Sequence, residues 1–352
     1  MPDTSEEAAA AQPVVAPLTS AALILVATIE PGGEPVVREV LPDLAAYARS
    51  IGFRFPGAGL VCVTGFGSDA WDRLFSGPRP AALHPFQELR GARHHAPSTP
   101  GDLLFHIRAE RMDVCYQWAS QLFDRLGGAV RIVDETHGFR YFDHRDLLGF
   151  VDGTENPVGD DARSAALVGS EDPDFAGGSY VVVQKYVHDL ASWNALSTEE
   201  QERVIGRTKL TDIEMADDVK PADSHVALNT ITDPDGTEHD ILRANMAFGS
   251  FGQGEFGTYF IGYAADPGVT EQMLRNMFLG SPLATHDRIL DFSTAVTGTL
   301  FHAPGADFLD APPPSPTSAV TAAPPEPTVQ APVPPGARDG SLHIGSLQES
   351  AP

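Results

Sequence analysis

Apolar residues recur along the chain at two spacings, one typical of strands and one typical of amphipathic helices. Residues 22–29 (ALILVATI) are almost continuously apolar, which predicts a buried strand. Residues 112–128 place apolar side chains at helical intervals and end in two glycines, which predicts a helix with a clear stop. Segments of both kinds follow one another as far as residue 304, so the chain alternates strand and helix.

The same patterns locate the other predicted elements. Strands are predicted at residues 59–66, 101–109, 178–189, 240–249, 257–266 and 290–304, and a strand or a hairpin is predicted at residues 130–142. Helices are predicted at residues 37–52, 68–75, 197–208 and 269–280. The first of these helices is expected to end at Gly52, because glycine readily adopts the left-handed conformation at a helix C-terminus. The helix at 197–208 is expected to begin with a capping box between Ser197 and Glu200.

Each half of the chain has the predicted order strand–helix–strand, strand–helix–strand. This order predicts an α+β protein built from duplicated ferredoxin-like (βαββαβ) halves with antiparallel sheets. We place the halves at residues 19–145 and 146–310. A dinucleotide-binding fold is excluded, because no GxGxxG motif follows the first strand, and the chain has no P-loop sequence.

Composition changes sharply at both ends of the chain. Residues 1–18 are rich in Ala, Pro and Glu and are expected to be loose. Residues 311–337 hold 10 of the chain's 30 prolines, and no aromatic residue follows Phe308. Such a segment cannot bury enough apolar surface to fold, so we expect a disordered linker. Apolar residues return in the last segment, 338–352.

The charge and the apolar content limit the classes of partner. The 352 residues carry a formal net charge of -25, and such an acidic surface repels the phosphates of nucleic acids and anionic lipids. No run approaches the ~18 apolar residues of a membrane span, and the acidic N-terminus does not resemble a secretion signal. The two cysteines, Cys62 and Cys115, lack a metal-binding spacing. We therefore expect a cytoplasmic protein that binds neither nucleic acid nor membrane.

Several polar residues could carry chemistry, but each also has an ordinary structural explanation. Asp152 precedes a glycine, and an Asp-Gly pair commonly forms a turn. His225 follows a polar linker, and a histidine that binds a metal needs an acceptor for its second ring nitrogen, which Asp287 could supply. Arg243 and Asn245 share one face of a predicted strand, which could be its core face or its solvent face. The residues alone leave these alternatives open.

Five segments, taken in their order, resemble the dye-decolourising peroxidases, a family of haem enzymes. They are GFVDGTENP (149–157), VIGRTKL (204–210), DSHVALN (223–229), ILRANMAFG (241–249) and THDRILDF (285–292). The first contains the GxxDG signature of that family, and the resemblance extends over roughly residues 20–305. It implies the duplicated ferredoxin-like fold, with one haem b per subunit bound in the C-terminal half.

The resemblance also implies roles for the candidate residues. His225 would ligate the haem iron through Nε2, and Asp287 would accept a hydrogen bond from Nδ1. Asp152, Arg243 and Asn245 would face the other side of the haem. There Asp152 would move a proton between the oxygens of peroxide, Arg243 would stabilise negative charge and keep Asp152 ionised, and Asn245 would help to hold peroxide or water. The resemblance leaves open whether Asp152 or Arg243 dominates.

Arg207 and three glutamates lie in or near the same segments. Arg207 could pair with a haem propionate or could be a solvated arginine at a helix end. Glu155, Glu214 and Glu238 could supply the oxygen ligands that suit Mn²⁺, but with 48 acidic residues in the chain their proximity could equally be chance. Manganese oxidation is therefore a separate hypothesis, which alanine substitutions of the three glutamates would test.

The function implied by the resemblance is a peroxidase that reduces hydrogen peroxide and oxidises small organic reductants such as phenols and dyes. A homo-oligomer is also expected. The alternative is a haem-binding or iron-handling protein with incidental peroxidase activity, which would need His225 but neither Asp152 nor Arg243. Loss of turnover with retained haem, after both residues are removed, would favour the enzyme.

The last segment of the chain resembles the C-terminal docking peptides that load cargo enzymes into encapsulin shells. In the matching sequence SLHIGSL, Leu342, Ile344 and Leu347 are apolar anchors, and Gly345 permits a bend between them. The proline-rich linker would supply reach. The resemblance implies an encapsulin shell protein as partner and a location inside an encapsulin nanocompartment in the cytoplasm. The plain alternative is a frayed tail with chance apolar residues.

Overall fold

Strands and helices alternate through the described part of the computed structural model, which comprises residues 10–282 and 284–316. All of these residues belong to one unit, Met1–Pro316. The three anchors predicted for the docking peptide, Leu342, Ile344 and Leu347, lie outside the described residues. In the described part, no helix is long and apolar enough to cross a membrane.

The elements of the two halves follow the predicted order. The N-terminal half contains β1 (Ala21–Ile29), α1 (Glu34–Val40), α2 (Leu44–Arg54), β2 (Val61–Gly67), α3 (Ser68–Leu74), β3 (Leu89–Arg90), β4 (His95–Ala96), β5 (Leu103–Ala109), α4 (Met112–Leu126) and β6 (Val130–Phe139). The C-terminal half contains α5 (Gly159–Ala166), β7 (Ser179–His188), α6 (Leu190–Asn194), α7 (Thr198–Ile205), α8 (His225–Asn229), β8 (Ile231–Thr232), β9 (Glu238–His239), β10 (Leu242–Arg243), β11 (Met246–Ser250), β12 (Glu255–Ala264), α9 (Pro267–Leu279), the 3-10 helix η6 (Arg288–Asp291), β13 (Ser293–Ala295), β14 (Thr299–Ala303) and α10 (Ala306–Asp310).

The main sheet joins strands of both halves. Its order is β10-β12-β11-β6-β1-β5-β2-β14-β7-β13, and β12 also pairs with β7, which closes the strands from β12 to β7 into a ring. Every pairing is antiparallel. The N-terminal half contributes β6-β1-β5-β2 and the C-terminal half contributes β14-β7-β12-β11, so the two halves have the same strand order. The prediction of duplicated ferredoxin-like halves is therefore confirmed.

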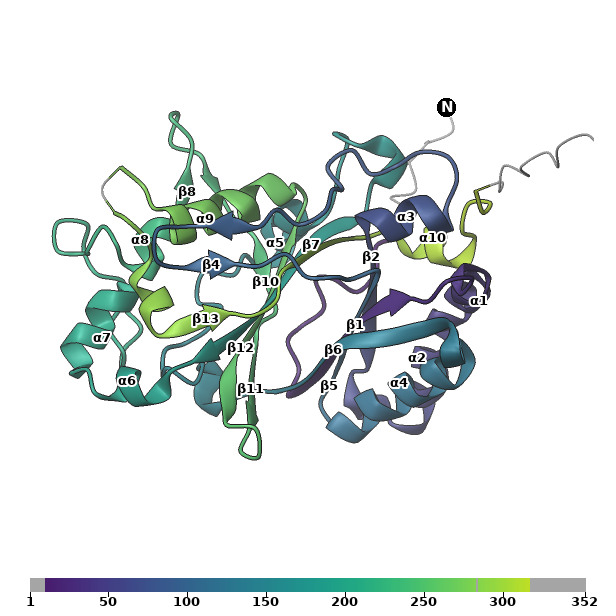
Figure 1. Cartoon of the computed structure of the whole chain (residues 1–352), viewed down its shortest axis with the longest axis horizontal. Helices are drawn as coiled ribbons and strands as arrows, with labels where there is room; N and C mark the ends of the chain where they lie inside the picture. Colours follow the sequence, from purple (N-terminus) through teal and green to yellow (C-terminus); the bar gives the residue numbers. More distant parts are fainter. Residues whose placement is uncertain (1–9, 283, 317–352) are drawn as a thin grey trace, which may run out of the picture. The chain divides into compact units, whose positions relative to one another are not determined.

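Strand β1 shows why residues 22–29 are apolar almost throughout. Leu23 and Leu25 belong to the core beneath the helices, whereas Ile24 and Val26 belong to a second core formed by side chains from the other face of the same strands. Successive side chains of a strand point to opposite faces, so a strand covered on both sides needs apolar residues at every position. Figure 1 shows α2 and α4 beside the N-terminal strands; in the C-terminal half, α9 packs on β7 and β12, and α8 lies next to α9.

Two of the predicted boundaries are wrong. The helix expected at 37–52 is interrupted by a 3-10 turn, Leu41–Asp43, because Pro42 has no N–H to donate within a helix. Its second part, α2, continues through Gly52 and ends at Arg54, so Gly52 is not a cap. The first bond of the predicted capping box is present, since the Ser197 side chain accepts a hydrogen bond from the Glu200 N–H at 3.2 Å.

Two predicted strands are each divided into shorter pieces. The strand expected at 240–249 consists of β10 and β11, which are separated at Ala244 and Asn245. The strand expected at 290–304 begins within η6 and continues as β13 and β14. The break between β10 and β11 lies at the cavity described below, where Asn245 is one of the lining residues.

Chain segments near both ends are better ordered than their composition predicts. Gln12 is 5% exposed, and its amide donates to the carbonyl oxygens of Thr64 and Pro304. At the other end, Arg38 Nη2 donates to the Pro313 carbonyl at 2.6 Å. The expectations of a loose segment at 1–18 and a disordered linker from 311 are therefore wrong for the parts 10–18 and 311–316.

Candidate functional site

A cavity opens among the strands and helices of the C-terminal half. Its walls come from β7, β12, α8, α9 and the loop after β6 that contains residues 146–155. Its empty space, including the part open to solvent, is about 1130 Å³. Apolar side chains cover much of the wall: Ile205, Ile241, Phe260, Met273, Leu274, Met277 and Ile289. The cavity therefore suits a large, mainly apolar cofactor.

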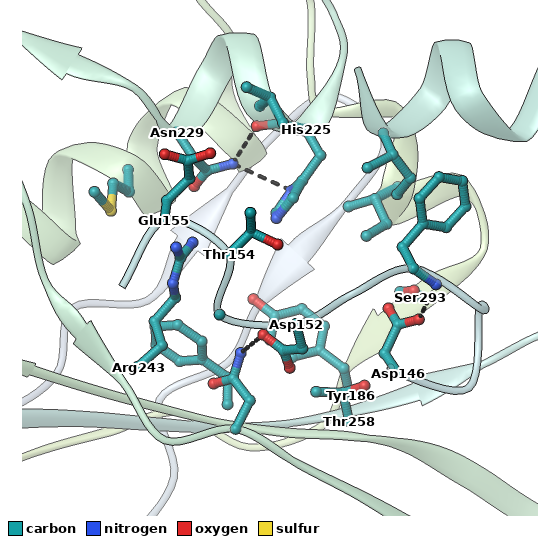
Figure 2. A pocket seen from close by; sticks show the side chains of 18 of the residues that line it. Asp146, Asp152, Thr154, Glu155, Tyr186, His225, Asn229, Arg243, Thr258 and Ser293 are labelled. Carbon is teal, nitrogen blue, oxygen red and sulfur yellow. Dashed lines mark hydrogen bonds between the residues drawn. The ribbon is translucent and has the colours of Figure 1, made fainter. Parts of the chain in front are cut away.

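His225 is the first residue of α8 and faces this cavity (Figure 2). Its Nδ1 lies 2.7 Å from Oδ2 of Asp287, whose side chain is completely buried. Asn229, one helical turn later, donates to the same carboxylate oxygen at 3.4 Å and to the His225 carbonyl at 2.7 Å. With Nδ1–H donating to Asp287, the lone pair of neutral His225 is on Nε2. The described residues offer Nε2 no hydrogen-bond partner, so it is free to bind a ligand in the cavity.

Burial and charge act in opposite directions on His225. Burial alone would lower its pKa, but the Asp287 carboxylate, by its charge and its hydrogen bond, raises the pKa above the ordinary value. Asp287 itself is fixed because its other oxygen accepts a hydrogen bond from the Ile289 N–H at 2.9 Å, at the start of η6. A buried carboxylate that orients an imidazole in this way is the usual support of a metal-ligating histidine.

Asp152 and Asn245 form a hydrogen-bonded pair on another side of the cavity. The Asn245 amide nitrogen donates to Asp152 Oδ1 at 3.0 Å. Its amide oxygen accepts from the Ile261 N–H at 3.1 Å, which fixes the amide so that its N–H groups face the carboxylate. Burial raises the pKa of Asp152, while Arg243 and the hydrogen bond from Asn245 oppose the rise without cancelling it. Asp152 was expected to be kept ionised by Arg243. Arg243 does lower the pKa of Asp152, but its effect is smaller than that of burial.

The loop around Asp152 is also the Asp-Gly turn that its sequence suggested. Gly149 and Gly153 have φ angles of 94° and 80°, which favour glycine. The Asn156 N–H closes a turn on the Gly153 carbonyl at 3.0 Å, and the Asp152 N–H donates to the His144 carbonyl at 2.8 Å. The structural and the chemical interpretations of Asp152 are thus compatible, because the turn places its side chain at the cavity.

Asn156 is a residue of the site that the sequence reasoning missed. Its amide oxygen accepts from the Arg243 N–H at 3.0 Å and from Arg243 Nε at 3.4 Å, and its amide nitrogen donates to the Arg243 carbonyl at 2.7 Å. Arg243 therefore reaches the cavity from β10 with its backbone and side chain both held by one amide. The one sequence signal for Asn156 was its place in the motif GFVDGTENP. Nothing in that motif indicated that Asn156 would contact Arg243.

Asp146 is a second acidic group that was missed. It lines the cavity, and its Oδ1 accepts from the Phe150 N–H at 3.0 Å. Burial, followed by the negative charge of nearby Asp152, raises the pKa of Asp146 to about 7. Figure 2 shows Asp146 and Asp152 side by side along the same loop. The site therefore contains two interacting carboxyl groups, both with raised pKa values.

Arg207 lies at the cavity in a group of acidic residues. It forms ion pairs with Glu155, with Asp212 at 3.1 Å and with Glu214 at 3.5 Å, and its side chain is 11% exposed. Glu155 and Glu214 thus converge on one guanidinium, whereas Glu238 lies on β9 and does not join them as a group of ligating atoms among the described residues. Manganese binding by these three glutamates stays a prediction.

The fold brings most of the predicted site residues to one place. Asp152, Arg207, His225, Arg243 and Asn245 all line the cavity, and Asp287 lies behind His225. Figure 2 shows the imidazole of His225 directed towards the region occupied by Asp152 and Arg243. The arrangement offers a metal-binding nitrogen, an acid–base group and a cation around one apolar space, which fits haem with an iron ligand on one side and a polar reaction site on the other.

Comparisons with known proteins agree with this geometry. Residues 11–140 match the family model described as "Dyp-type peroxidase, N-terminal", and residues 143–308 match "Dyp-type peroxidase, C-terminal". The chain is 62% identical over 340 residues to a dye-decolorizing peroxidase of Rhodococcus erythropolis, covering 97% of each protein. It is also 62% identical over 339 residues to one of Mycobacterium tuberculosis, covering 96% of this chain and 97% of the relative.

Two solved structures are similar as well. The encapsulated DyP-type peroxidase from Mycobacterium smegmatis matches with a TM-score of 0.87 and 66% identity, over 88% of this chain and 100% of the other. A variant of DypB from Rhodococcus jostii in complex with heme matches with a TM-score of 0.83 and 58% identity, over 86% of this chain and 98% of the other.

Proposed function

Because this chain belongs to the Dyp-type peroxidase family and is therefore a haem-dependent peroxidase, we propose that His225 ligates its haem iron and that hydrogen peroxide reacts beside Asp152 and Arg243. The observation that carries the proposal is the hydrogen bond from His225 Nδ1 to buried Asp287, at 2.7 Å. It leaves Nε2 for the iron and makes the imidazole a stronger donor. When bound, haem b, one per subunit, supplies the redox chemistry that passes electrons from a donor to peroxide.

Asp152 has the position and the acidity of a proton carrier. Reduction of peroxide to water requires a proton to leave one oxygen and reach the other, and a carboxylate within hydrogen-bond reach can transfer it, directly or through one water. The raised pKa of Asp152 brings its acidity closer to neutral pH, at which a general acid–base group works best. Asn245 holds this carboxylate at 3.0 Å and has a second N–H with which to hold peroxide or water.

Arg243 supplies a permanent positive charge beside Asp152. A guanidinium cannot be deprotonated in a protein, so Arg243 stabilises negative charge that develops on a peroxide oxygen. Its partner Asn156 keeps it in place through three hydrogen bonds, and we assign Asn156 a positioning role. Arg207, nearly buried among carboxylates at the cavity wall, would exchange part of these contacts for a haem propionate.

In this proposal, small organic reductants such as phenols and dyes donate the electrons that reduce peroxide. The protein is also proposed to form a homo-oligomer. The similar protein from Mycobacterium smegmatis is described as encapsulated. This relative and the C-terminal sequence with Leu342, Ile344 and Leu347 support an encapsulin shell as the partner and its lumen in the cytoplasm as the location. The linker begins at a defined point, because Arg38 and Ser76 bind the Pro313 and Pro314 carbonyls.

Two variants, each compared with the parent protein, test the assignment of the site. In His225→Ala, the Soret spectrum of the ferric protein should change or disappear, because the iron loses its ligand. In the double variant Asp152→Asn/Arg243→Leu, haem should remain and peroxide turnover should fall by at least about 100-fold. Parent-level turnover by the double variant would instead support the alternative, a haem-binding or iron-handling protein with incidental peroxidase activity.

A further inference from the structure

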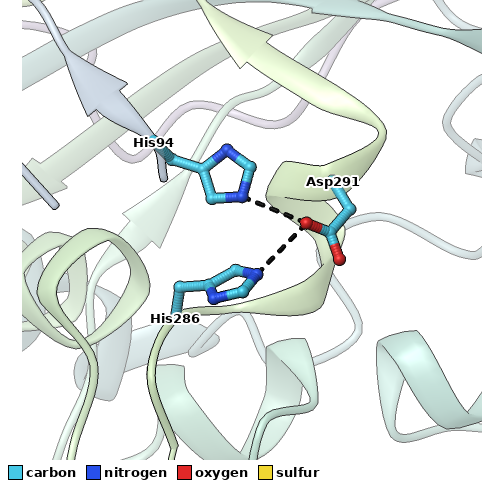
Figure 3. A group of neighbouring side chains, drawn as sticks. All are labelled: His94, His286 and Asp291. Carbon is cyan, nitrogen blue, oxygen red and sulfur yellow. Dashed lines mark hydrogen bonds and ion pairs between the residues drawn. The ribbon is translucent and has the colours of Figure 1, made fainter. Parts of the chain in front are cut away.

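A second group of metal-ligating side chains lies outside the cavity. His94, between β3 and β4, meets His286 and Asp291 from the turn that leads through η6 (Figure 3). Nε2 of His94 and Nε2 of His286 are each 3.1 Å from the same oxygen, Oδ1 of Asp291. The two imidazole rings are 4.7 Å apart, centre to centre. We propose that these three residues bind a divalent first-row transition-metal ion such as Zn²⁺.

The spacing of the ligand atoms is close to that of a metal site. All three lie within 4.8 Å of one another. A tetrahedral ion with bonds of about 2.0–2.1 Å keeps its ligand atoms about 3.3 Å apart, so a small closure of the group is sufficient. An ion held by His94, His286 and Asp291 would retain an open position for water, as ions with three protein ligands do.

The surroundings hold the ligands in place before an ion arrives. Nδ1 of His286 lies 3.1 Å from Oγ1 of Thr285, which can accept a hydrogen bond from Nδ1–H when Nε2 binds a metal. The His94 carbonyl accepts from the Gly91 N–H at 3.0 Å, which fixes the turn between β3 and β4. The Asp287 N–H donates to the Met277 carbonyl at 2.9 Å and so ties the other turn to α9. Ligands on rigid turns lose little entropy when they bind an ion.

Burial and ligand type indicate which ion fits. The side chains of His94 and His286 are 18% and 10% exposed, while Asp291 is 24% exposed and opens the group to solvent. Two imidazoles with one carboxylate suit Zn²⁺, Fe²⁺ or Co²⁺ better than Mg²⁺ or Ca²⁺, which prefer oxygen ligands. Arg93 is the competing cation, since its guanidinium lies 3.5 Å from Asp291 Oδ1. Its side chain is 65% exposed, so it can move into solvent when an ion binds.

The metal-ligating group lies next to Asp287, the carboxylate that supports His225. If His225 ligates the haem iron, as proposed above, ion binding should also affect this support. Asp287 lies between His286 and Asp291 in the chain, so an ion bound by these two would restrain the turn that presents Asp287 to His225. Ion binding itself is independent of haem ligation. A test that reads ion binding therefore keeps the two proposals separate.

The test measures zinc binding to the haem-loaded, full-length protein. The protein is purified without a polyhistidine tag and is treated with a chelator before the measurement. Titration calorimetry with ZnCl₂ should find a site that is weakened more than about 10-fold in His94→Ala and in Asp291→Asn. His137→Ala is the matched control, because His137 pairs with a single carboxylate, Glu135, on the surface. This variant should bind zinc as the parent does.

Arg93→Ala distinguishes a metal site from a simple ion-pair cluster. Removal of the competing guanidinium should tighten zinc binding, whereas loss of an ordinary ion-pair partner would not. His94→Ala and Asp291→Asn lie on separate segments, and circular dichroism establishes that each is folded before the titration is compared. The proposal is overturned if the parent shows no zinc site, or if both folded variants bind zinc with the parent's affinity.

Discussion

Asp287 and His225 lie 62 positions apart in the chain, yet the Asp287 carboxylate is 2.7 Å from the imidazole Nδ1. The carboxylate is completely buried and the other ring nitrogen faces the cavity. The pair therefore sets the direction in which His225 can act as a ligand. It also raises the pKa of His225 against the effect of burial, so the negative charge of Asp287 controls the electronic character of the imidazole.

Asp287→Asn removes this charge while keeping the size of the side chain. The imidazole then loses anionic character, so the iron is less stabilised in its oxidised state and its reduction potential should rise. We expect kcat/KM for peroxide to fall by about 10–100-fold. Potentiometric titration followed by absorption measures the first effect. Asp287 is the N-cap residue of η6, and Asp189 is the N-cap residue of α6. Asp189→Asn is therefore the matched control and should leave the reduction potential unchanged.

Arg243→Leu should move the acid limb of the peroxide reaction to higher pH. Burial raises the pKa of Asp152 and Arg243 is the main opposing influence, so removal of Arg243 raises that pKa further. A proton acceptor works only when ionised, so activity is lost as pH falls through this pKa. Profiles of kcat/KM against pH for the parent and the variant would contradict this account if their acid limbs coincided.

Asn156→Ala should lower kcat/KM for peroxide without loss of haem. Asn156 touches Arg243 through three hydrogen bonds, and a displacement of about 1 Å at a reacting group can cost up to about 100-fold in rate. Asn156→Asp keeps the acceptor for the Arg243 N–H groups but not the donor to its carbonyl. An activity between those of the parent and the alanine variant is therefore expected for the aspartate variant. Equal activity of the parent and Asn156→Ala would remove the positioning role.

Asp146 should make stability depend on pH in the direction opposite to that of an ordinary salt-bridged aspartate. Its pKa is about 7 in the folded protein against an ordinary value of 3.8. The folded state therefore holds the proton more tightly, and stability is fully present below the ordinary pKa and is lost as pH rises through about 7.

Asp146→Asn removes this titration and keeps an oxygen that can accept from the Phe150 N–H. From pH 5 to pH 8 the free energy of unfolding of the variant should rise relative to the parent by on the order of 2 kcal/mol, reduced to the extent that water reaches the cavity wall. Urea unfolding of the haem-free protein at the two pH values measures the difference. A constant difference between variant and parent at both pH values would show that Asp146 does not titrate in this range.

The C-terminal sequence gives a prediction about packaging. Replacement of Leu342, Ile344 and Leu347 by alanine should abolish co-purification with a co-expressed encapsulin shell, because the apolar anchors are lost, and should leave peroxidase activity unchanged. The matched control replaces Ser341, which precedes the first anchor, together with His343 and Ser346, which lie between the anchors, and should still be loaded. Loading of the triple anchor variant at the parent level would show that the shell recognises another part of the chain.

The regular elements could be predicted because their apolar spacing is local. The run at 22–29 and the helix at 112–128 are present as β1 and α4. Prediction failed where a local signal was weak or overridden. Pro42 divided a helix, and Gly52 stayed inside one. Short elements such as α8 were not predicted, because five residues carry too little periodicity to be recognised.

The sequence by itself determined the order of the elements, the apolar faces of the strands and the motifs that reveal the family. Only the tertiary structure decided which polar residues meet. Asn156 reaches Arg243 across 87 positions, and His94 reaches Asp291 across 197. Asp146 acquires its raised pKa mainly from burial, which the sequence around it does not reveal. The physical reason is that hydrophobic periodicity is written in consecutive residues, whereas hydrogen bonds, desolvation and charge depend on distances that exist only after the chain has folded.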